Sequence, residues 1–159
     1  MIAAPPYVHP WPIGVGPRYQ PPARVRAGRP VGRLRCGRSG TTFAVHLELF
    51  ANRRVVIVPA GIGVAHDGCR YPLTTSDPTG VVRVARRGRH TLGDLFAVWG
   101  RQLSPRALLS FRGRVRVFVD GRERRADPRR IVLRRHDEIV VEIRGYVAPH
   151  PFYLFPRGE

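Results

Sequence analysis

Lysine is absent from this chain, whose 28 basic residues are all arginine. Acidic residues are few, and the 11 aspartates and glutamates leave a formal net charge of +17. Such a surplus makes a polyanion, either a nucleic acid or an anionic surface, the first partner to consider, while a protein partner stays open. Because the chain also has 17 glycines and 16 prolines, genomic base composition explains the arginine usage about equally well.

Long apolar runs are also missing, and none approaches the length of a membrane span. The first residues, MIAAPPYVHPWPIG, lack the basic and apolar regions of a secretory signal. We therefore expect no transmembrane segment in this chain and, as the sequence stands, a cytoplasmic location.

The common catalytic motifs do not occur: there is no G-x-S-x-G, no phosphate-binding glycine loop and no H-E-x-x-H. The triplet His136-Asp137-Glu138 has the composition of an acid/base cluster. Consecutive residues of a strand point to opposite faces, however, so the three side chains do not converge on one substrate atom. We expect a protein that is not an enzyme and has no cofactor.

Cysteine is scarce, with only Cys36 and Cys69. A disulfide, two free thiols or a share in a metal site are all open, and the disulfide ranks slightly ahead of the free thiols. Together with His46 and His66, the cysteines compose a candidate Cys2His2 zinc site. Because Cys36 and His46 lack the spacing of paired ligands, this metal site ranks third.

The residues that are present favour strands around one helix. Residues 43–50 alternate apolar and other side chains, Asn52 suits a tight turn, and residues 54–58 form a β-branched run, which together predict a hairpin. A second hairpin is predicted from a strand at 115–119, the turn Asp120-Gly121 and a strand at 131–133. Residues 139–143 form a strong closing strand.

Thr91 begins the clearest helix, with Asp94 three residues later and an apolar stripe that ends at Gly100. A second short helix is predicted from Ser104 to Leu109. The fold expected is α+β, a mostly antiparallel sheet of two hairpin-like units packed on one main helix, with a β-grasp-like arrangement as a candidate.

Three segments follow from composition: an arm rich in Pro, Gly and Arg at 1–40, extended or disordered in part, one α+β domain at 41–145, and an extended C-terminal strap at 146–159. The arm's aromatic and arginine side chains suit stacking on a nucleic-acid strand, although a tail lying on the domain is favoured over this. The candidate polyanion-binding residues are Arg24, Arg26, Arg29, Arg33, Arg35, Arg38, Arg86, Arg87 and Arg89.

Several motifs from His46 to Glu159 resemble a group of largely uncharacterised bacterial and archaeal proteins. The motifs are VPAGIG at 58–63, TLGDLFAVWG at 91–100, VFVDG at 117–121, DEIVV at 137–141 and FYLFPRG at 152–158. The resemblance implies a shared fold but no activity, and it implies an exported or envelope-associated location, because members often carry an export or anchor segment.

Members of that group also carry a histidine cluster that looks like a transition-metal site. This chain departs from the cluster at most positions and retains only His46 and Asp77. Other residues replace the histidines and the carboxylate: Thr42, Ala44, Thr74, Ser76, Arg83 and Ala85. Since an arginine repels a cation, the resemblance implies a degenerate site with no bound metal.

The function expected is a non-enzymatic binding or structural module whose degenerate metal site takes an anion instead. The candidate anion-binding residues are His46, Thr74, Ser76, Asp77 and Arg83. The alternatives are a nucleic-acid or polyanion-binding protein, and a metal-binding protein that uses the Cys2His2 set.

Overall fold

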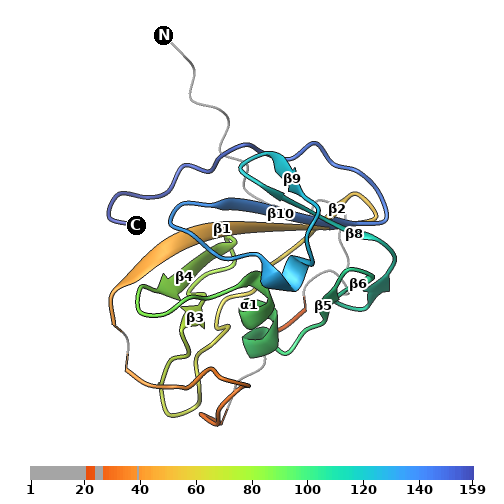
Figure 1. Cartoon of the computed structure of the whole chain (residues 1–159). Helices are drawn as coiled ribbons and strands as arrows, with labels where there is room; N and C mark the ends of the chain where they lie inside the picture. The colour runs from red at the N-terminus through yellow and green to blue at the C-terminus, as the bar shows by residue number, and fades with distance from the viewer. Residues whose placement is uncertain (1–20, 24–26, 39) are drawn as a thin grey trace.

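A mixed β-sheet with one short helix against it dominates the computed structural model, which describes residues 21–23, 27–38 and 40–159 (Figure 1). Among these residues, seven strands build the sheet: β1 (Thr42–Ala51), β2 (Arg54–Val56), β3 (Leu73–Thr74), β4 (Val81–Ala85), β8 (Val115–Val119), β9 (Arg122–Arg124) and β10 (Glu138–Ile143). The order is β3-β4-β1-β10-β8-β9, with β2 paired to the end of β1. The central β1–β10 pair is parallel and the other pairs are antiparallel.

The first hairpin and the main helix form where the sequence predicts them. Asn52 and Arg53 both have positive φ angles, 53° and 61°, which lets a two-residue turn join β1 to β2. The helix α1 (Leu92–Trp99) has a capping box, in which the Thr91 hydroxyl accepts from the Asp94 N–H at 3.2 Å and Asp94 Oδ2 accepts from the Thr91 N–H at 2.9 Å. Gly100 ends the helix in the left-handed conformation.

The second hairpin differs from the prediction in its returning strand. Asp120 and Gly121 form the predicted turn after β8, with φ angles of 51° and 77°. Because this turn is short, the chain pairs at once as β9 and does not wait for residues 131–133. Val132 forms only an isolated bridge with Thr91, and the 3-10 helix η2 (Pro128–Arg130) precedes it.

The predicted second helix at 104–109 is wrong. Three short strands form a separate antiparallel sheet there: β5 (Leu103–Ser104), β6 (Ala107–Leu108) and β7 (Phe111–Arg112). Leu103 pairs directly with Leu108, and both are buried in the core. Pro105 lies between β5 and β6, so this proline marks a hairpin turn instead of a first helical turn.

The two faces of the main sheet differ in chemistry. Odd-numbered residues of β1, such as Val45 and Leu47, are fully buried in a core shared with Leu95, Phe96 and Trp99 of α1. The apolar stripe of the helix is therefore core, as its spacing predicts. Even-numbered residues of β1 point to the opposite face, which carries polar side chains.

The C-terminal segment covers that polar face. Figure 1 shows it, in dark blue, running along the side of the sheet opposite α1 without regular secondary structure. The Val147 N–H donates to Glu142 Oε2 at 3.0 Å, and the Pro151 backbone lies close to Gly121. We call this segment, residues 146–159, the strap.

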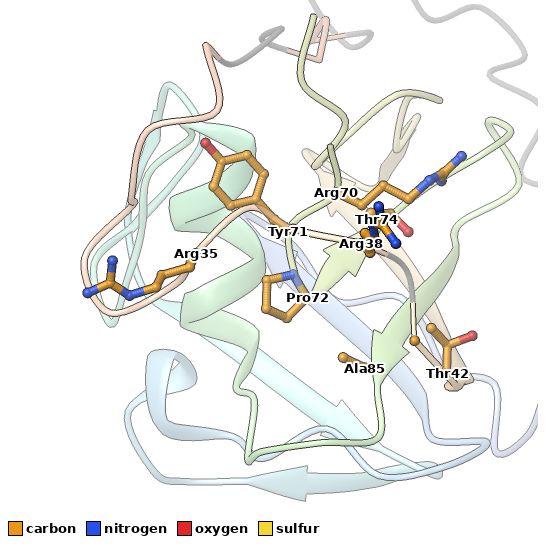
Figure 2. Close-up of a pocket in the computed structure, with 10 residues that line it drawn as sticks. Arg35, Arg38, Thr42, Arg70, Tyr71, Pro72, Thr74 and Ala85 are labelled. Atoms are coloured by element: carbon orange, nitrogen blue, oxygen red, sulfur yellow. The ribbon is translucent and has the colours of Figure 1, made fainter. Parts of the chain in front are cut away.

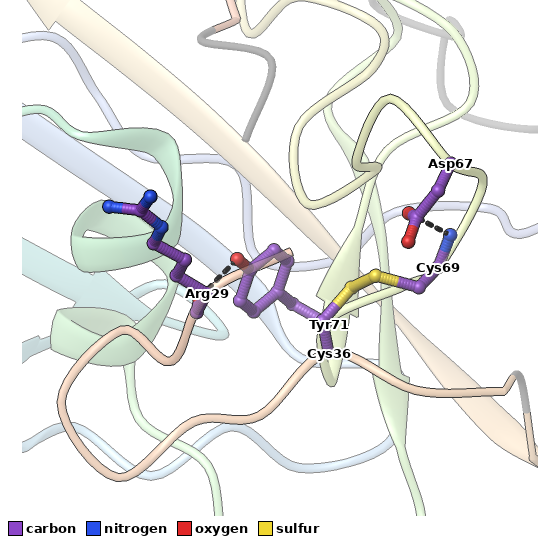
Figure 3. The surroundings of a disulfide bond; sticks show 5 residues. All are labelled: Arg29, Cys36, Asp67, Cys69 and Tyr71. Atoms are coloured by element: carbon purple, nitrogen blue, oxygen red, sulfur yellow. Dashed lines mark hydrogen bonds between the residues drawn. A yellow bond between two sulfur atoms is a disulfide. The ribbon is translucent and has the colours of Figure 1, made fainter. Parts of the chain in front are cut away.

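The described part of the N-terminal arm is attached to the domain. Cys36 and Cys69 form a disulfide with their Cα atoms 5.6 Å apart, which confirms the first-ranked alternative for these residues (Figure 3). Leu34 is buried in the core, and the Tyr71 hydroxyl donates to the Arg29 carbonyl at 2.5 Å.

The one α-helix of the described residues, α1, has 8 residues, and no described helix has the length and apolar character needed to cross a membrane.

Candidate functional site

A buried group of histidine and glutamate side chains lies on the polar face of the sheet. The parallel pairing of β1 with β10 places His46 opposite Glu138, and Glu48 is two residues further along β1 on the same face. The exposed fractions of His46, Glu48 and Glu138 are 0%, 4% and 1%. Each of the three offers one ligand atom, a ring nitrogen or a carboxylate oxygen, and these atoms lie within 4.8 Å of one another.

Both ring nitrogens of His46 are engaged. Nε2 lies 2.9 Å from the Thr79 carbonyl oxygen, which can only accept, so Nε2 carries a proton. Nδ1 lies 2.7 Å from Glu138 Oε2. Gly80 makes this approach feasible, because a side chain at that position would meet the His46 ring.

Burial shifts the pKa values of both partners in the direction of their neutral forms. Burial, and then the nearby Glu48 carboxylate, raise the pKa of Glu138 to about 10. Burial likewise lowers the pKa of His46. Both pKa shifts favour a neutral imidazole whose bare Nδ1 accepts a hydrogen bond from the protonated Glu138 carboxyl.

The strap contributes two more side chains to this group. His150 Nδ1 lies 2.8 Å from Glu48 Oε2, and the Tyr153 ring stacks on the His46 ring. A second buried carboxyl on β10, Glu142, lies at the other end of the same face. Burial raises the pKa of Glu142, although the Val147 N–H and the Arg116 guanidinium oppose this shift.

The positions that the family resemblance assigns to a metal site share this face in part. Register places Thr42 opposite Ala85, and Arg83 opposite both Ala44 and Thr74. The Arg83 guanidinium forms an ion pair with the Glu159 carboxylate. Ser76 and Asp77 lie in the exposed loop before β4, where Asp77 Oδ1 accepts from the Thr79 N–H at 3.2 Å.

A separate hollow of about 130 Å³ lies between the arm and the edge of the sheet (Figure 2). Three arginines from two chain segments line it, namely Arg35, Arg38 and Arg70. Their guanidinium groups make no hydrogen bond or ion pair with another described residue. The hydroxyl-bearing side chains of Thr42 and Thr74 also line the hollow, and Figure 2 shows Arg35 set apart from Thr74 on the far side of Tyr71.

The backbone beside the disulfide holds this hollow in shape. Cys36 lies between Arg35 and Gly37, and Cys69 precedes Arg70. Gly37 and Arg70 exchange two main-chain hydrogen bonds of 2.9 Å each. The two arginine-bearing segments are therefore joined both by the disulfide and by the backbone.

The remaining predicted polyanion-binding residues are scattered over the surface. Arg24 and Arg26 lie outside the described residues. The Arg33 guanidinium donates to the Asp94 carboxylate at 2.6 Å and to the Arg89 carbonyl at 2.9 Å. Arg86 Nε donates to the Thr42 carbonyl at 3.1 Å. The side chains of Arg29, Arg87 and Arg89 are exposed.

A denser arginine surface lies on the opposite edge of the sheet. Two hollows of about 280 and 480 Å³ occur around β8, β9 and η2. We call their basic lining the β8–β9 arginine surface: Arg106, Arg114, Arg116, Arg124, Arg125, Arg130, Arg134 and Arg135. Sequence reasoning missed this set, although arginine recurs at alternate positions through 112–116 and again at 122–125.

The Cys2His2 alternative does not assemble in the oxidised chain. The disulfide occupies both sulfurs, whereas zinc binds cysteine as thiolate. His46 is fully buried on the sheet, and His66 is exposed in a turn. This alternative stays a prediction for the reduced chain.

The sequence contained one usable signal for the buried group. Glu48 follows His46 by two residues in an otherwise apolar strand, and residues two apart in a strand lie on the same face. Glu138 and His150 join them only through strand register and the path of the strap, for which the sequence carries no local signal.

Comparison of the chain with protein-family models, with curated proteins and with solved structures finds no match.

Proposed function

We propose that this chain is a non-enzymatic binding module that takes an anionic group, a phosphate or a carboxylate, in the hollow beside the disulfide. The observation that carries this proposal is the set of three arginines, Arg35, Arg38 and Arg70, with no acidic partner among the described residues. Guanidinium groups form strong charge-assisted hydrogen bonds with carboxylates and phosphates. The hydroxyls of Thr42 and Thr74 add neutral donors at the same place.

The composition of the hollow supports binding without chemistry. None of its described lining residues has a carboxylate, an imidazole or a free thiol, the groups that most often transfer protons or attack a substrate. The one phenol present, Tyr71, already donates its hydroxyl proton to the Arg29 carbonyl.

The proposal includes a β-grasp-like fold. In favour of it, the first and last long strands, β1 and β10, form a parallel central pair, and each has an antiparallel partner on its outer side, β4 and β8 respectively. The helix crosses between the two halves on one face (Figure 1). This arrangement also supports membership of the family that the sequence resembles, in which this chain would be a member with a degenerate histidine cluster.

The test is binding of inorganic phosphate and pyrophosphate to the full oxidised chain by calorimetry. Since a hydrogen bond to a charged group contributes roughly 1.5–3 kcal/mol, Arg70→Ala should weaken binding by about 10-fold or more. Arg87→Ala is the matched control, because it removes the same charge from an exposed side chain outside the hollow. Equal losses of phosphate affinity in the two variants would mean that anion binding depends only on the net charge of the protein.

The β8–β9 arginine surface favours a second function, binding of a nucleic acid or another polyanion. Eight arginines line two adjoining hollows that share Arg124. A single phosphate fills only one hollow, whereas a polyanion spans both. The two proposed functions therefore differ in how affinity depends on ligand length.

A further inference from the structure

We propose that the polar face of the sheet binds one divalent first-row transition-metal ion between His46 Nδ1 and the carboxylates of Glu48 and Glu138. The donor atoms already lie within 4.8 Å of one another, and all three side chains are at least 96% buried. This site is separate from the arginine hollow, so the test of one proposal does not affect the other.

The tautomer of His46 suits a metal ligand. Histidines that bind metals commonly donate their other ring N–H to a backbone carbonyl, which fixes the ring orientation and leaves one lone pair for the ion. Here the Thr79 carbonyl holds the Nε2 proton at 2.9 Å and directs Nδ1 to the two carboxyl groups.

A buried carboxylate oxygen on this face favours a bound cation. Glu138 Oε1 is buried and receives no hydrogen bond from a described N–H or hydroxyl group, and the neighbouring Glu48 carboxyl can bond to Glu138 only while the two acids share a proton. A buried polar atom without a partner has a free-energy cost, so it requires an explanation. One dication would pair with this oxygen, and Glu138 would release its proton as the ion binds, so that the ion balances two carboxylates in a dry environment.

Rearrangement of the three side chains is enough to admit the ion, with no change in the strand register that brings them together. Ligand bonds of about 2.0–2.2 Å at tetrahedral or octahedral angles separate neighbouring donor atoms by about 3 Å or slightly more. His46 Nδ1 and Glu138 Oε2 are 2.7 Å apart and would separate by a few tenths of an ångström, whereas any donor pair near the 4.8 Å limit of the group would move closer together. One imidazole and two carboxylates suit zinc or manganese.

The strap covers the site and holds one of its carboxylates. His150 Nδ1 lies 2.8 Å from Glu48 Oε2 and is therefore placed to orient Glu48 toward the ion. Tyr153 covers the His46 ring. The ion would thus fasten the strap to the sheet in a closed, structural site.

This donor set differs from the one that the family resemblance implies, because only His46 is common to both. The resemblance predicts no bound metal because other residues, above all Arg83, replace the histidines of the family. The Arg83 charge is balanced by Glu159, which reduces its repulsion of a cation on the same face.

The test uses the full chain, stripped of metal with a chelator and kept without reductant so that Cys36 and Cys69 stay bonded. Native mass spectrometry and calorimetry with Zn²⁺ and with Mn²⁺ should show one ion per chain for at least one of them. Glu138→Gln should fold, because its amide can donate to His46 Nδ1, and yet it removes a ligand. Loss of an outer partner of a metal ligand typically costs 10–100-fold in affinity, so loss of this ligand should cost more than about 100-fold.

Glu142→Gln is the matched control, since it neutralises a carboxyl that is equally buried on the same strand and should leave the ion bound. His150→Ala should weaken binding by about 10–100-fold, because it removes the partner that orients Glu48. Absence of stoichiometric binding of both ions, or equal affinities for Glu138→Gln and Glu142→Gln, would overturn the proposal and leave a buried hydrogen-bonded network.

Discussion

Tyr153 lies flat on His46, with ring centroids 3.7 Å apart and an angle of 9° between the ring planes. This stack is the closest ring contact between the strap and the sheet among the described residues, and it covers a side chain that is fully buried.

We expect Tyr153→Ala to lower the free energy of unfolding by about 2–3 kcal/mol, since it removes aromatic burial and ring stacking together. Chemical denaturation measures this change. Phe152→Ala is the control, because its side chain is 50% exposed and should contribute much less. Similar losses of unfolding free energy in the two variants would mean that the stack of Tyr153 on His46 does not contribute to stability.

Removal of the disulfide should loosen the arm and the arginine hollow together. Cys36 and Cys69 are 33 residues apart, and chain entropy for a loop of this length predicts a loss of about 3–4 kcal/mol in Cys36→Ser/Cys69→Ser. Phosphate binding should weaken in this double variant and in the reduced native chain. Unchanged phosphate affinity in both would contradict a ligand site that depends on the bridge.

Gly80→Ala should destabilise the chain by at least about 2 kcal/mol, because it combines left-handed strain with steric overlap. The new Cβ would clash with the Leu47 carbonyl and lie 3.0 Å from His46 Nε2. Gly68→Ala has a similar φ of 81° but meets no atom, so it measures the strain alone, about 1 kcal/mol. The difference between the two thermal or chemical unfolding curves isolates the crowding next to His46.

Glu142 should make stability depend on pH in the direction opposite to that of an ion-paired acid. Burial raises its pKa, so the folded state favours the protonated form. The stabilisation is fully present below the ordinary glutamate pKa and is lost as pH rises through the higher folded-state value.

Native chain and Glu142→Gln, compared by urea denaturation at pH 4 and pH 7, should therefore differ more at pH 7, where the native chain becomes the less stable of the two. Other titrating groups cancel in this difference. A gap that narrows as pH rises would show that Arg116 stabilises the carboxylate more than burial opposes it.

The β8–β9 arginine surface should bind single-stranded oligonucleotides with a steep dependence on salt. Each phosphate contact contributes roughly 0.7–0.9 to the slope of log affinity against log salt, so Arg124→Ala/Arg130→Ala should reduce that slope by up to about two units. Arg53→Ala/Arg54→Ala removes the same charge from the exposed β1–β2 turn and should leave the slope nearly unchanged. No binding at low salt, or equal slopes in both variants, would exclude this surface as a nucleic-acid site.

Local signals in the sequence predicted the local structure well. Thr91, Asp94 and Gly100 define the helix because capping depends on groups three or four residues apart. Asp120 and Gly121 define a turn for the same reason, since the positive φ angles belong to those residues themselves. The local sequence at Pro105 fits both a first helical turn and a hairpin turn, and the pairing of Leu103 with Leu108 favours the hairpin.

The buried group was beyond local reasoning because its members are distant in sequence. The triplet His136-Asp137-Glu138 was predicted not to converge, and each member does have a different partner. His136 stacks on Phe155, Asp137 accepts from the Arg134 N–H, and Glu138 meets His46. Which of the three would meet a histidine 92 residues away depends on the register of two parallel strands, and no nearby residue encodes that register.

The parallel pair also sets an order of events during synthesis. β1 is made early, but its central partner β10 leaves the ribosome some ninety residues later, so the middle of the sheet stays open in the nascent chain. During that interval the apolar side of β1 and an unpaired backbone edge are exposed to other chains. Productive folding in the cell therefore depends on how well the growing chain is shielded until Ile143 has been added.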